Sequence, residues 1–185
     1  MRLSIVLLLS LLAAGCDRQK ADVPQGEAPV AASAAKPESG KIDRSHAGEP
    51  TPAVEFRDPE GEAASLADFR GRPLLLNLWA TWCAPCIAEM PTLDALAARG
   101  GKLQVLAVSQ DFAGQEAKIA TFFEERKLAA LEHYQDPELG LMDALKAEVL
   151  PTTILYDAQG REVWRVVGAL DWNGPKAAKL IGEAR

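Results

Sequence analysis

The sequence predicts one α/β domain in which helices pack on a mixed β-sheet. Apolar runs typical of buried strands alternate with stretches whose apolar residues recur at helical spacing, and a hairpin and a last helix follow. The expected strands span 74–79, 103–108, 131–134, 153–156 and 162–167, and the expected helices span 84–99, 114–127, 138–146 and about 173–184. This order predicts an α/β sandwich around one mixed sheet.

The domain is expected to begin at residue 51 with a β-hairpin. Two short stretches, 54–56 and 63–66, flank the turn signal Asp-Pro-Glu-Gly at 58–61. We therefore assign residues 51–185 to the folded domain.

Residues 1–15 are predicted to be an export signal. One basic residue, Arg2, precedes an apolar run from 3 to 14 that only Ser4 and Ser10 interrupt. The run is too short to cross a bilayer as a helix, which needs about 20 residues, and is typical of a secretory signal.

A cysteine follows this apolar run directly. The stretch Leu-Ala-Ala-Gly-Cys at 12–16 resembles a bacterial lipobox, with Ala13 where leucine is more usual. The resemblance implies that Cys16 is lipidated and that Asp17 retains the protein in the inner membrane, with the outer membrane as the alternative. An ordinary signal peptide followed by a chance cysteine is the other interpretation.

Residues 16–50 are predicted to be the lipidated cysteine and a disordered tether. The segment is rich in Ala, Pro, Gly and Ser, and it lacks aromatic residues and apolar periodicity. The chain of 185 residues carries a net charge of −6. This balance argues against nucleic-acid binding and against electrostatic docking on anionic lipid.

The stretch Trp-Ala-Thr-Trp-Cys-Ala-Pro-Cys at 79–86 is the predicted redox site. A buried strand leads into Cys83 and a helix begins there, so the free N–H groups and partial positive charge of the helix N-terminus favour a thiolate. Cys86 lies one helical turn on, near enough to close a disulfide ring, and Pro85 fits the first turn. The spacing predicts a dithiol site with Cys83 as nucleophile.

Two other interpretations of the cysteine pair remain. A zinc site needs about four ligands. The chain holds three Cys and two His, of which His46 falls in the expected tether and His133 has no ligand partner at helical spacing. Two inert core cysteines would leave Trp82 and Pro85 beside them unexplained. We expect no bound metal and no cofactor.

The active-site stretch resembles the thioredoxin superfamily, and within it the TlpA/ResA-like periplasmic thiol-disulfide oxidoreductases. The matching residues run from Asn77 to Cys86, then Glu89-Met90-Pro91, and the resemblance extends over roughly residues 51–185. It implies a thioredoxin-like three-layer sandwich with a mixed central sheet and an N-terminal β-hairpin.

The resemblance also implies roles for particular residues. Glu89 would be a buried acid/base for the resolving Cys86, with a solvated glutamate on the helix surface as the alternative. Thioredoxin carries an acid on the preceding strand, where this chain has Asn77. Pro151 corresponds to the superfamily's cis-proline, which would bring the backbone of Leu150 beside the cysteines to pair with a substrate strand.

Trp82 and Pro85 complete the expected substrate-binding residues. Trp82 is expected to shield Cys83 and to shape the docking surface, while Trp79, Trp164 and Trp172 are expected to be packing residues.

Local charge favours reduction over oxidation. No Lys, Arg or His lies between Arg72 and Arg99, and the charged residues in that span, Glu89 and Asp94, are acidic. The thiolate at Cys83 would therefore depend mainly on the helix dipole, which predicts a reductant or weak oxidant.

The predicted function is a membrane-tethered periplasmic reductase of protein disulfides, expected to be monomeric. The resemblance implies cytochrome c maturation or copper-centre assembly as settings, and a membrane electron donor of the DsbD/CcdA type. A thiol oxidase or isomerase is the alternative. A thiol peroxidase or a metal chaperone are further alternatives; peroxiredoxins share the fold but carry their peroxidatic cysteine in a different motif.

Overall fold

The structure, a computed structural model, describes residues 40–184. The strands are Lys41–Asp43 (β1), Glu55–Arg57 (β2), Ala63–Ser65 (β3), Leu74–Trp79 (β4), Gln104–Ser109 (β5), Tyr134–Gln135 (β6), Thr152–Tyr156 (β7) and Glu162–Val167 (β8). The helices are a 3₁₀ turn, Leu66–Phe69 (η1), and Ala84–Ala98 (α1), Glu116–Arg126 (α2), Gly140–Ala144 (α3) and Pro175–Ile181 (α4).

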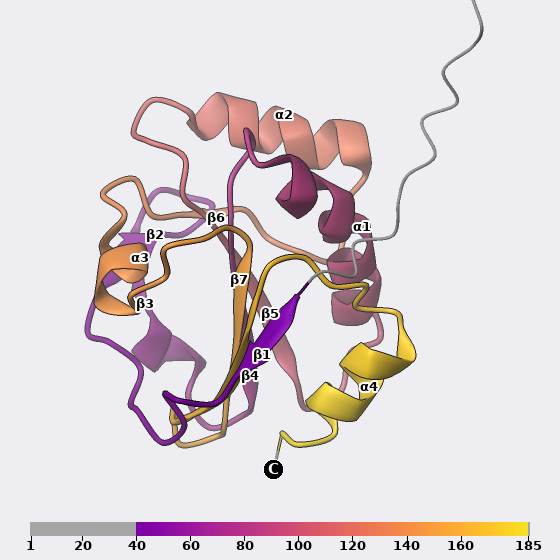
Figure 1. Ribbon diagram of the computed structural model, residues 1–185. Coiled ribbons are helices and arrows are strands. Elements are labelled where there is room, and N and C mark those ends of the chain that lie inside the picture. The colour runs from indigo at the N-terminus through magenta and orange to yellow at the C-terminus, as the bar shows by residue number, and fades with distance from the viewer. Residues whose placement is uncertain (1–39, 185) are drawn as a thin grey trace, which may run out of the picture. The chain divides into compact units, whose positions relative to one another are not determined.

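Within this part of the chain the strands form one mixed sheet of eight, in the order β1-β8-β7-β4-β5-β6-β2-β3 (Figure 1). β4 is parallel to β5, and β5 to β6, whereas the other neighbours are antiparallel. All six residues of β4 are buried, as expected for a strand that is covered on both faces.

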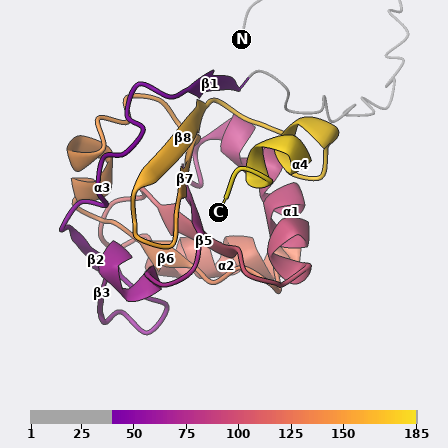
Figure 2. The same ribbon diagram turned by 90° about the horizontal axis from the view of Figure 1, so that it is seen from below.

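Two apolar cores lie on the two faces of the sheet, because successive strand residues point to opposite sides. One core contains Leu75 and Trp79 of β4 with apolar residues of α1, α2 and α4. The other contains Leu74, Leu76 and Leu78 with apolar residues of η1 and α3. Figures 1 and 2 show α1 and α4 on one side of the sheet and α3 on the other. The expected three-layer, thioredoxin-like α/β sandwich is confirmed.

The predicted elements are present in the predicted order. β2 and β3 form the expected hairpin, with Phe56 opposite Ala64. α1 continues through Pro91 and is followed by Gly100 and Gly101, whose φ angles of 64° and 100° are ones that glycine adopts readily. The fold thus places the cysteine pair between a central strand and its helix, as expected.

The boundary predicted at residue 51 is wrong, because ordered structure begins earlier. β1 lies in the segment assigned to the tether, and it pairs with β8 through Lys41 opposite Val167. Further on, Gly48 N donates to Glu162 O at 2.7 Å. A strand of three residues carries too little apolar pattern to be predicted, since its stability comes from pairing with a strand far along the chain.

The predicted signal peptide (1–15), Cys16 and Asp17 lie outside the described residues. Between residues 40 and 184, no helix is both long enough and apolar enough to span a bilayer.

Candidate active site

The cysteine pair sits at the N-terminus of α1. Cys83 is the N-cap, and its Sγ accepts a hydrogen bond from the backbone N–H of Cys86 at 3.3 Å. The two sulfurs are joined in a disulfide with an S–S length of 2.04 Å and a Cα–Cα distance of 5.2 Å. Pro85 is exposed in the first turn, where its missing N–H leaves no broken helical bond.

The two sulfurs differ in their access to solvent. Cys83 is 6 % exposed, whereas Cys86 is fully buried. Trp82, directly before Cys83, is 62 % exposed, so its ring is on the surface next to the less buried sulfur. A protein thiol or disulfide can therefore approach Cys83 first, which fits its predicted role as the attacked and attacking sulfur.

Glu89 is fully buried one helical turn after Cys86. Its carboxylate accepts from Asn77 Nδ2 at 2.8 Å and from the Leu170 backbone N–H at 2.9 Å. Burial raises the pKa of Glu89 from its ordinary 4.5 to about 7, against the lowering effect of these hydrogen bonds. The alternative of a solvated glutamate is therefore wrong.

Asn77 holds this carboxyl group in place from β4. Its Nδ2 also donates to Thr153 Oγ1 on β7 at 2.9 Å, which orients the amide between two partners. Asn77 Oδ1 is buried without a hydrogen-bond partner among the described residues. The indole of Trp172 is near enough to the Glu89 carboxylate to lower its pKa slightly. The buried acid thus contacts neutral hydrogen-bonding groups, and it forms no ion pair with any described residue.

Asp111, two residues after β5, holds the loop that precedes Cys83 in place. Its carboxylate accepts from the Thr81 backbone N–H at 2.8 Å and from Thr81 Oγ1 at 2.6 Å. Ser109 Oγ donates to the same carboxylate at 2.7 Å. We conclude that Asp111 is a buried support of the active-site loop.

The Leu150–Pro151 peptide bond is cis, as the resemblance implied. Thr152 pairs with Leu78 of β4, so the loop lies at the same end of the sheet as the cysteines. The backbone of Leu150 makes no hydrogen bond to any other described residue. Its N–H and C=O are therefore available to an incoming strand.

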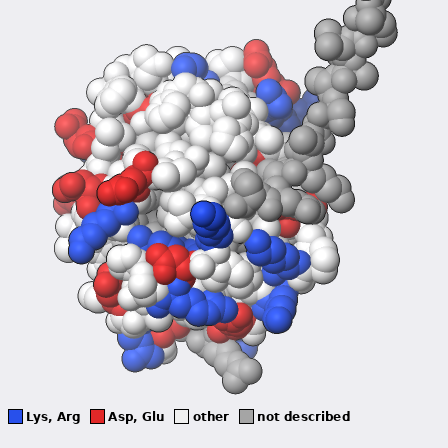
Figure 3. Space-filling view, viewed as in Figure 1, with Lys and Arg blue, Asp and Glu red and all other residues white. Residues whose placement is uncertain are grey.

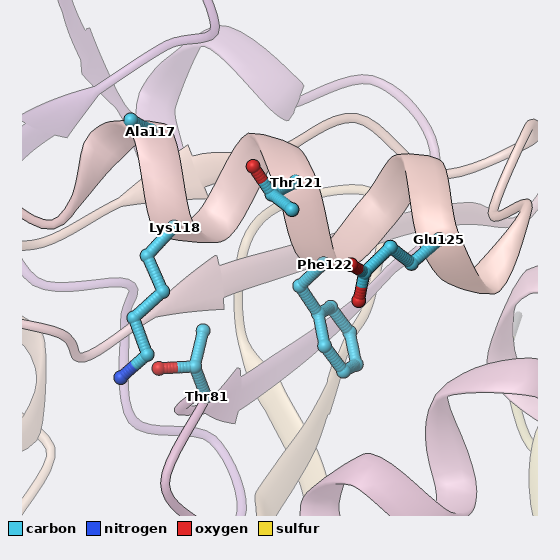
Figure 4. A pocket seen from close by; sticks show the side chains of 6 residues that line it. All are labelled: Thr81, Ala117, Lys118, Thr121, Phe122 and Glu125. Atoms are coloured by element: carbon cyan, nitrogen blue, oxygen red, sulfur yellow. The ribbon is translucent and has the colours of Figure 1, made fainter.

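A surface pocket of about 380 Å³ lies beside the active-site loop, between Thr81 and one face of α2. In Figure 4 the side chain of Lys118 extends from α2 toward Thr81. Sequence reasoning missed this cation, because it lies 35 positions after Cys83 and no local pattern links the two.

The structure thus gathers Trp82, Cys83, Cys86 and Pro151 at one end of the sheet, with Glu89 beneath them. Comparisons with known proteins agree with this arrangement. A sequence profile of the AhpC/TSA family matches residues 47–169, more than half of the chain. The chain belongs to this family.

Named relatives define its type more closely. The chain is 34% identical over 145 residues to the thiol:disulfide interchange protein DsbE of Pseudomonas fluorescens biotype C, covering 75% of this chain and 79% of that protein. It is 28% identical over 121 residues to the thiol-disulfide oxidoreductase ResA of Bacillus cereus, covering 65% of this chain and 69% of that protein.

A solved structure shows the same fold. The exposed lipoprotein thioredoxin Etrx1 of Streptococcus pneumoniae strain TIGR4 superposes with a TM-score of 0.57 at 26% identity, over 70% of this chain and 96% of that one. Together with the cysteine geometry, these likenesses make the chain a thioredoxin-like thiol-disulfide oxidoreductase of the DsbE/ResA type.

Proposed function

We propose that this enzyme is an exported, lipid-anchored reductase of protein disulfides. The observation that carries the proposal is the cysteine pair itself: a reachable Cys83 at the N-terminus of α1, with Cys86 buried behind it. The unpaired backbone of Leu150 and the exposed Trp82 supply contacts for a polypeptide rather than for a small molecule.

The reaction transfers two electrons and two protons to the client. In the reduced enzyme, the Cys83 thiolate attacks one client sulfur, the client S–S bond breaks, and the first client thiolate leaves and takes up a proton. Cys86 then loses its proton and attacks Cys83 Sγ, which releases the second client thiol and forms the Cys83–Cys86 disulfide. The client ends as a dithiol and the enzyme as the disulfide seen here.

Glu89 is proposed to accept the proton of Cys86 in the second step. A general base works best when its pKa lies near the operating pH, and burial places the pKa of Glu89 at about 7. Its position one turn after Cys86 on the same helix puts the carboxyl group on the side of the buried sulfur.

Lipidation of Cys16 would tether the domain to a membrane, the inner one if Asp17 acts as a retention signal. The lipoprotein Etrx1 is a structural relative with such a description. A membrane electron donor of the DsbD/CcdA type is the proposed source of the electrons. Cytochrome c maturation and copper-centre assembly are the proposed settings.

The proposal is tested by trapping the mixed disulfide. In a Cys86→Ser variant the second step is blocked, so client proteins stay attached to Cys83 and can be identified by mass spectrometry after non-reducing separation. The double variant Cys83→Ser/Cys86→Ser is the matched control. Capture of cysteine-containing exported proteins by the single variant alone is expected, and equal recovery from both variants would overturn the proposal.

The direction of electron flow is tested by the reduction potential of the pair. The reduction potential of a reductase is expected to be near that of thioredoxin, about −270 mV. A potential near that of DsbA, about −120 mV, would indicate that the protein is an oxidase instead. Lys118 is the group to examine, because a cation near the thiolate would favour the reduced form and raise the potential.

A further inference from the structure

Large apolar side chains are exposed at one end of the sheet. Trp82 follows β4, Phe112 follows β5 and Val149 precedes β7, and all three are exposed. Trp79 pairs with Ser109, and Leu78 pairs with Thr152, so the three segments lie at the same end of the sheet. The segment with Trp82 and Cys83 follows β4 and therefore lies between the other two. Ile42 is also exposed; it lies on the edge strand β1 opposite Val166, and β8 separates it from β7 and Val149.

Phe112 is exposed on a backbone that is firmly held. Its ring is 63 % exposed, although it directly follows the buried Asp111 that binds Thr81. Gln135 Nε2 donates to Asp111 O at 2.9 Å and to Phe112 O at 3.1 Å. The ring is thus presented to solvent from a fixed position, which is the arrangement of an aromatic anchor that loses little freedom on binding.

The segments that carry these side chains are poor in charge: residues 79–86, 112–115 and 149–155 contain no Lys, Arg, Asp or Glu. Figure 3 shows an area without Lys, Arg, Asp or Glu in the middle of its upper half, bordered by charged side chains along the upper edge and lower down. A partner that fits this end of the domain would carry apolar rather than charged side chains.

The free backbone of Leu150 indicates that the bound client segment is extended. An extended segment that pairs with Leu150 lies on the β7 side of Cys83, next to Val149. On the β5 side of Cys83 it meets Phe112, and Trp82 lies directly before Cys83. The target cysteine would then sit between two apolar contact points.

We propose that Phe112 determines client specificity: with Trp82 and Val149 it forms a docking surface for extended client segments that carry apolar residues on both sides of the target cysteine. This inference rests on the proposed function, since it names the kind of polypeptide that the same site accepts.

The test uses two synthetic peptides of equal length, each with one internal disulfide. One has Leu and Val beside its cysteines, and the other has Ser and Asp at those positions. Reduced enzyme is mixed with each peptide, and single-turnover rates are measured by acid quench, alkylation and mass spectrometry. The small disulfide DTNB reports thiol reactivity that needs no docking.

We expect wild-type enzyme to reduce the apolar peptide about tenfold faster than the polar one. Phe112→Ser should bring the two peptide rates within about twofold of each other, while Phe112→Tyr should retain the preference. Ile42→Ser, which removes an exposed apolar side chain from the edge strand, is the matched control and should also retain it.

The outcomes separate the two proposals. Equal rates on both peptides with wild-type enzyme, or an unchanged preference in Phe112→Ser, would overturn the docking surface and leave the reductase proposal in place. Reaction with DTNB but with neither peptide would overturn the reductase proposal and the docking surface together.

Discussion

Glu89 and Glu162 are both buried, but their carboxylates have different partners. Glu162 on β8 accepts two hydrogen bonds from Arg165, from Nε and from Nη2, each at 2.7 Å. Arg165 also donates to Leu145 O at 2.7 Å. Glu89 receives hydrogen bonds from an amide and a backbone N–H, with no cation among these partners.

The difference between these partners shows that a buried glutamate can form a stable ion pair at one site and exchange a proton at another. Burial alone would lower the pKa of Arg165, but the hydrogen bonds and negative charge of Glu162 raise it, so the pair stays charged. For Glu89 nothing of that strength opposes desolvation, and the pKa of its carboxyl rises to about 7. A buried acid without a cation can therefore exchange its proton near neutral pH.

Breaking the Glu162–Arg165 pair should have the largest effect on stability. Arg165→Met leaves the charge of Glu162 buried and uncompensated, and we expect the free energy of unfolding to fall by about 3–5 kcal/mol. Urea unfolding measures this change. The double variant Glu162→Leu/Arg165→Met should recover most of the loss, and a double variant as unstable as the single one would contradict this account.

Glu89→Gln should remove a pH dependence of stability. The unfolded chain releases the Glu89 proton near pH 4.5 and the folded protein near pH 7, so wild-type stability should fall by about 3 kcal/mol as the pH rises through this window. Below pH 4.5 both states hold the proton and the group contributes nothing. A glutamine side chain cannot titrate, so this part of the slope should disappear in unfolding experiments on the oxidised variant.

Glu89→Gln is suited to this test because the surroundings of Glu89 can accommodate a side-chain amide. Asn77 Oδ1 has no partner among the described residues, so Asn77 can turn its amide and accept from the new side-chain NH₂. A slope in Glu89→Gln equal to that of wild type would show that another group titrates between pH 4.5 and 7.

Glu89→Gln should also slow the second chemical step. Loss of a general base typically costs about 10²-fold, and we expect this near neutral pH, with the deficit shrinking as the pH approaches the ordinary thiol pKa of about 8.5. Rapid-quench measurement of client release from the mixed disulfide gives the rate. A slowing that is the same at every pH would indicate misplaced cysteines rather than a lost base.

These sites differ in how far the sequence reveals them. Cys83, Cys86 and Glu89 share one helix at spacings of three, so their proximity follows from helical geometry. The partners of Glu89 do not: Leu170 lies 81 positions away and meets the carboxyl group only because the chain folds back between β8 and α4. Burial, and with it the raised pKa, depends on such distant contacts.

The Glu162–Arg165 pair and β1 illustrate the same limit. Two opposite charges three residues apart are usually a surface pair, but this pair is buried, and Arg165 contacts the distant Leu145 O. β1 is three residues long and acquires its structure from β8. Local pattern therefore predicted the sheet centre and the cysteine helix, and missed contacts that join the ends of the chain.

Asn77→Ala should raise the pKa of Glu89 further. The hydrogen bond from Asn77 favours the charged carboxylate, so its loss should move the pKa upward by about one unit. Titration of the Glu89 side-chain carboxyl carbon by NMR measures the shift. Thr153→Val, which removes the other partner of Asn77, is the control and should shift the pKa much less; a downward shift in Asn77→Ala would contradict this role.

Tyr156→Phe should have the smallest effect on stability, although Tyr156 lies close enough to Glu162 for the charge of Glu162 to affect its pKa. The Tyr156 hydroxyl is buried with no hydrogen-bond partner among the described residues, and burial, followed by the charge of Glu162, raises its pKa. Removing this hydroxyl breaks no hydrogen bond and leaves a space the size of only one oxygen atom. We therefore expect the free energy of unfolding to stay equal or to rise by up to about 1 kcal/mol. Urea unfolding at neutral pH gives the value. A loss above about 1 kcal/mol would mean that the hydroxyl is bonded after all, and that the charged pair of Glu162 and Arg165 depends on a third polar group.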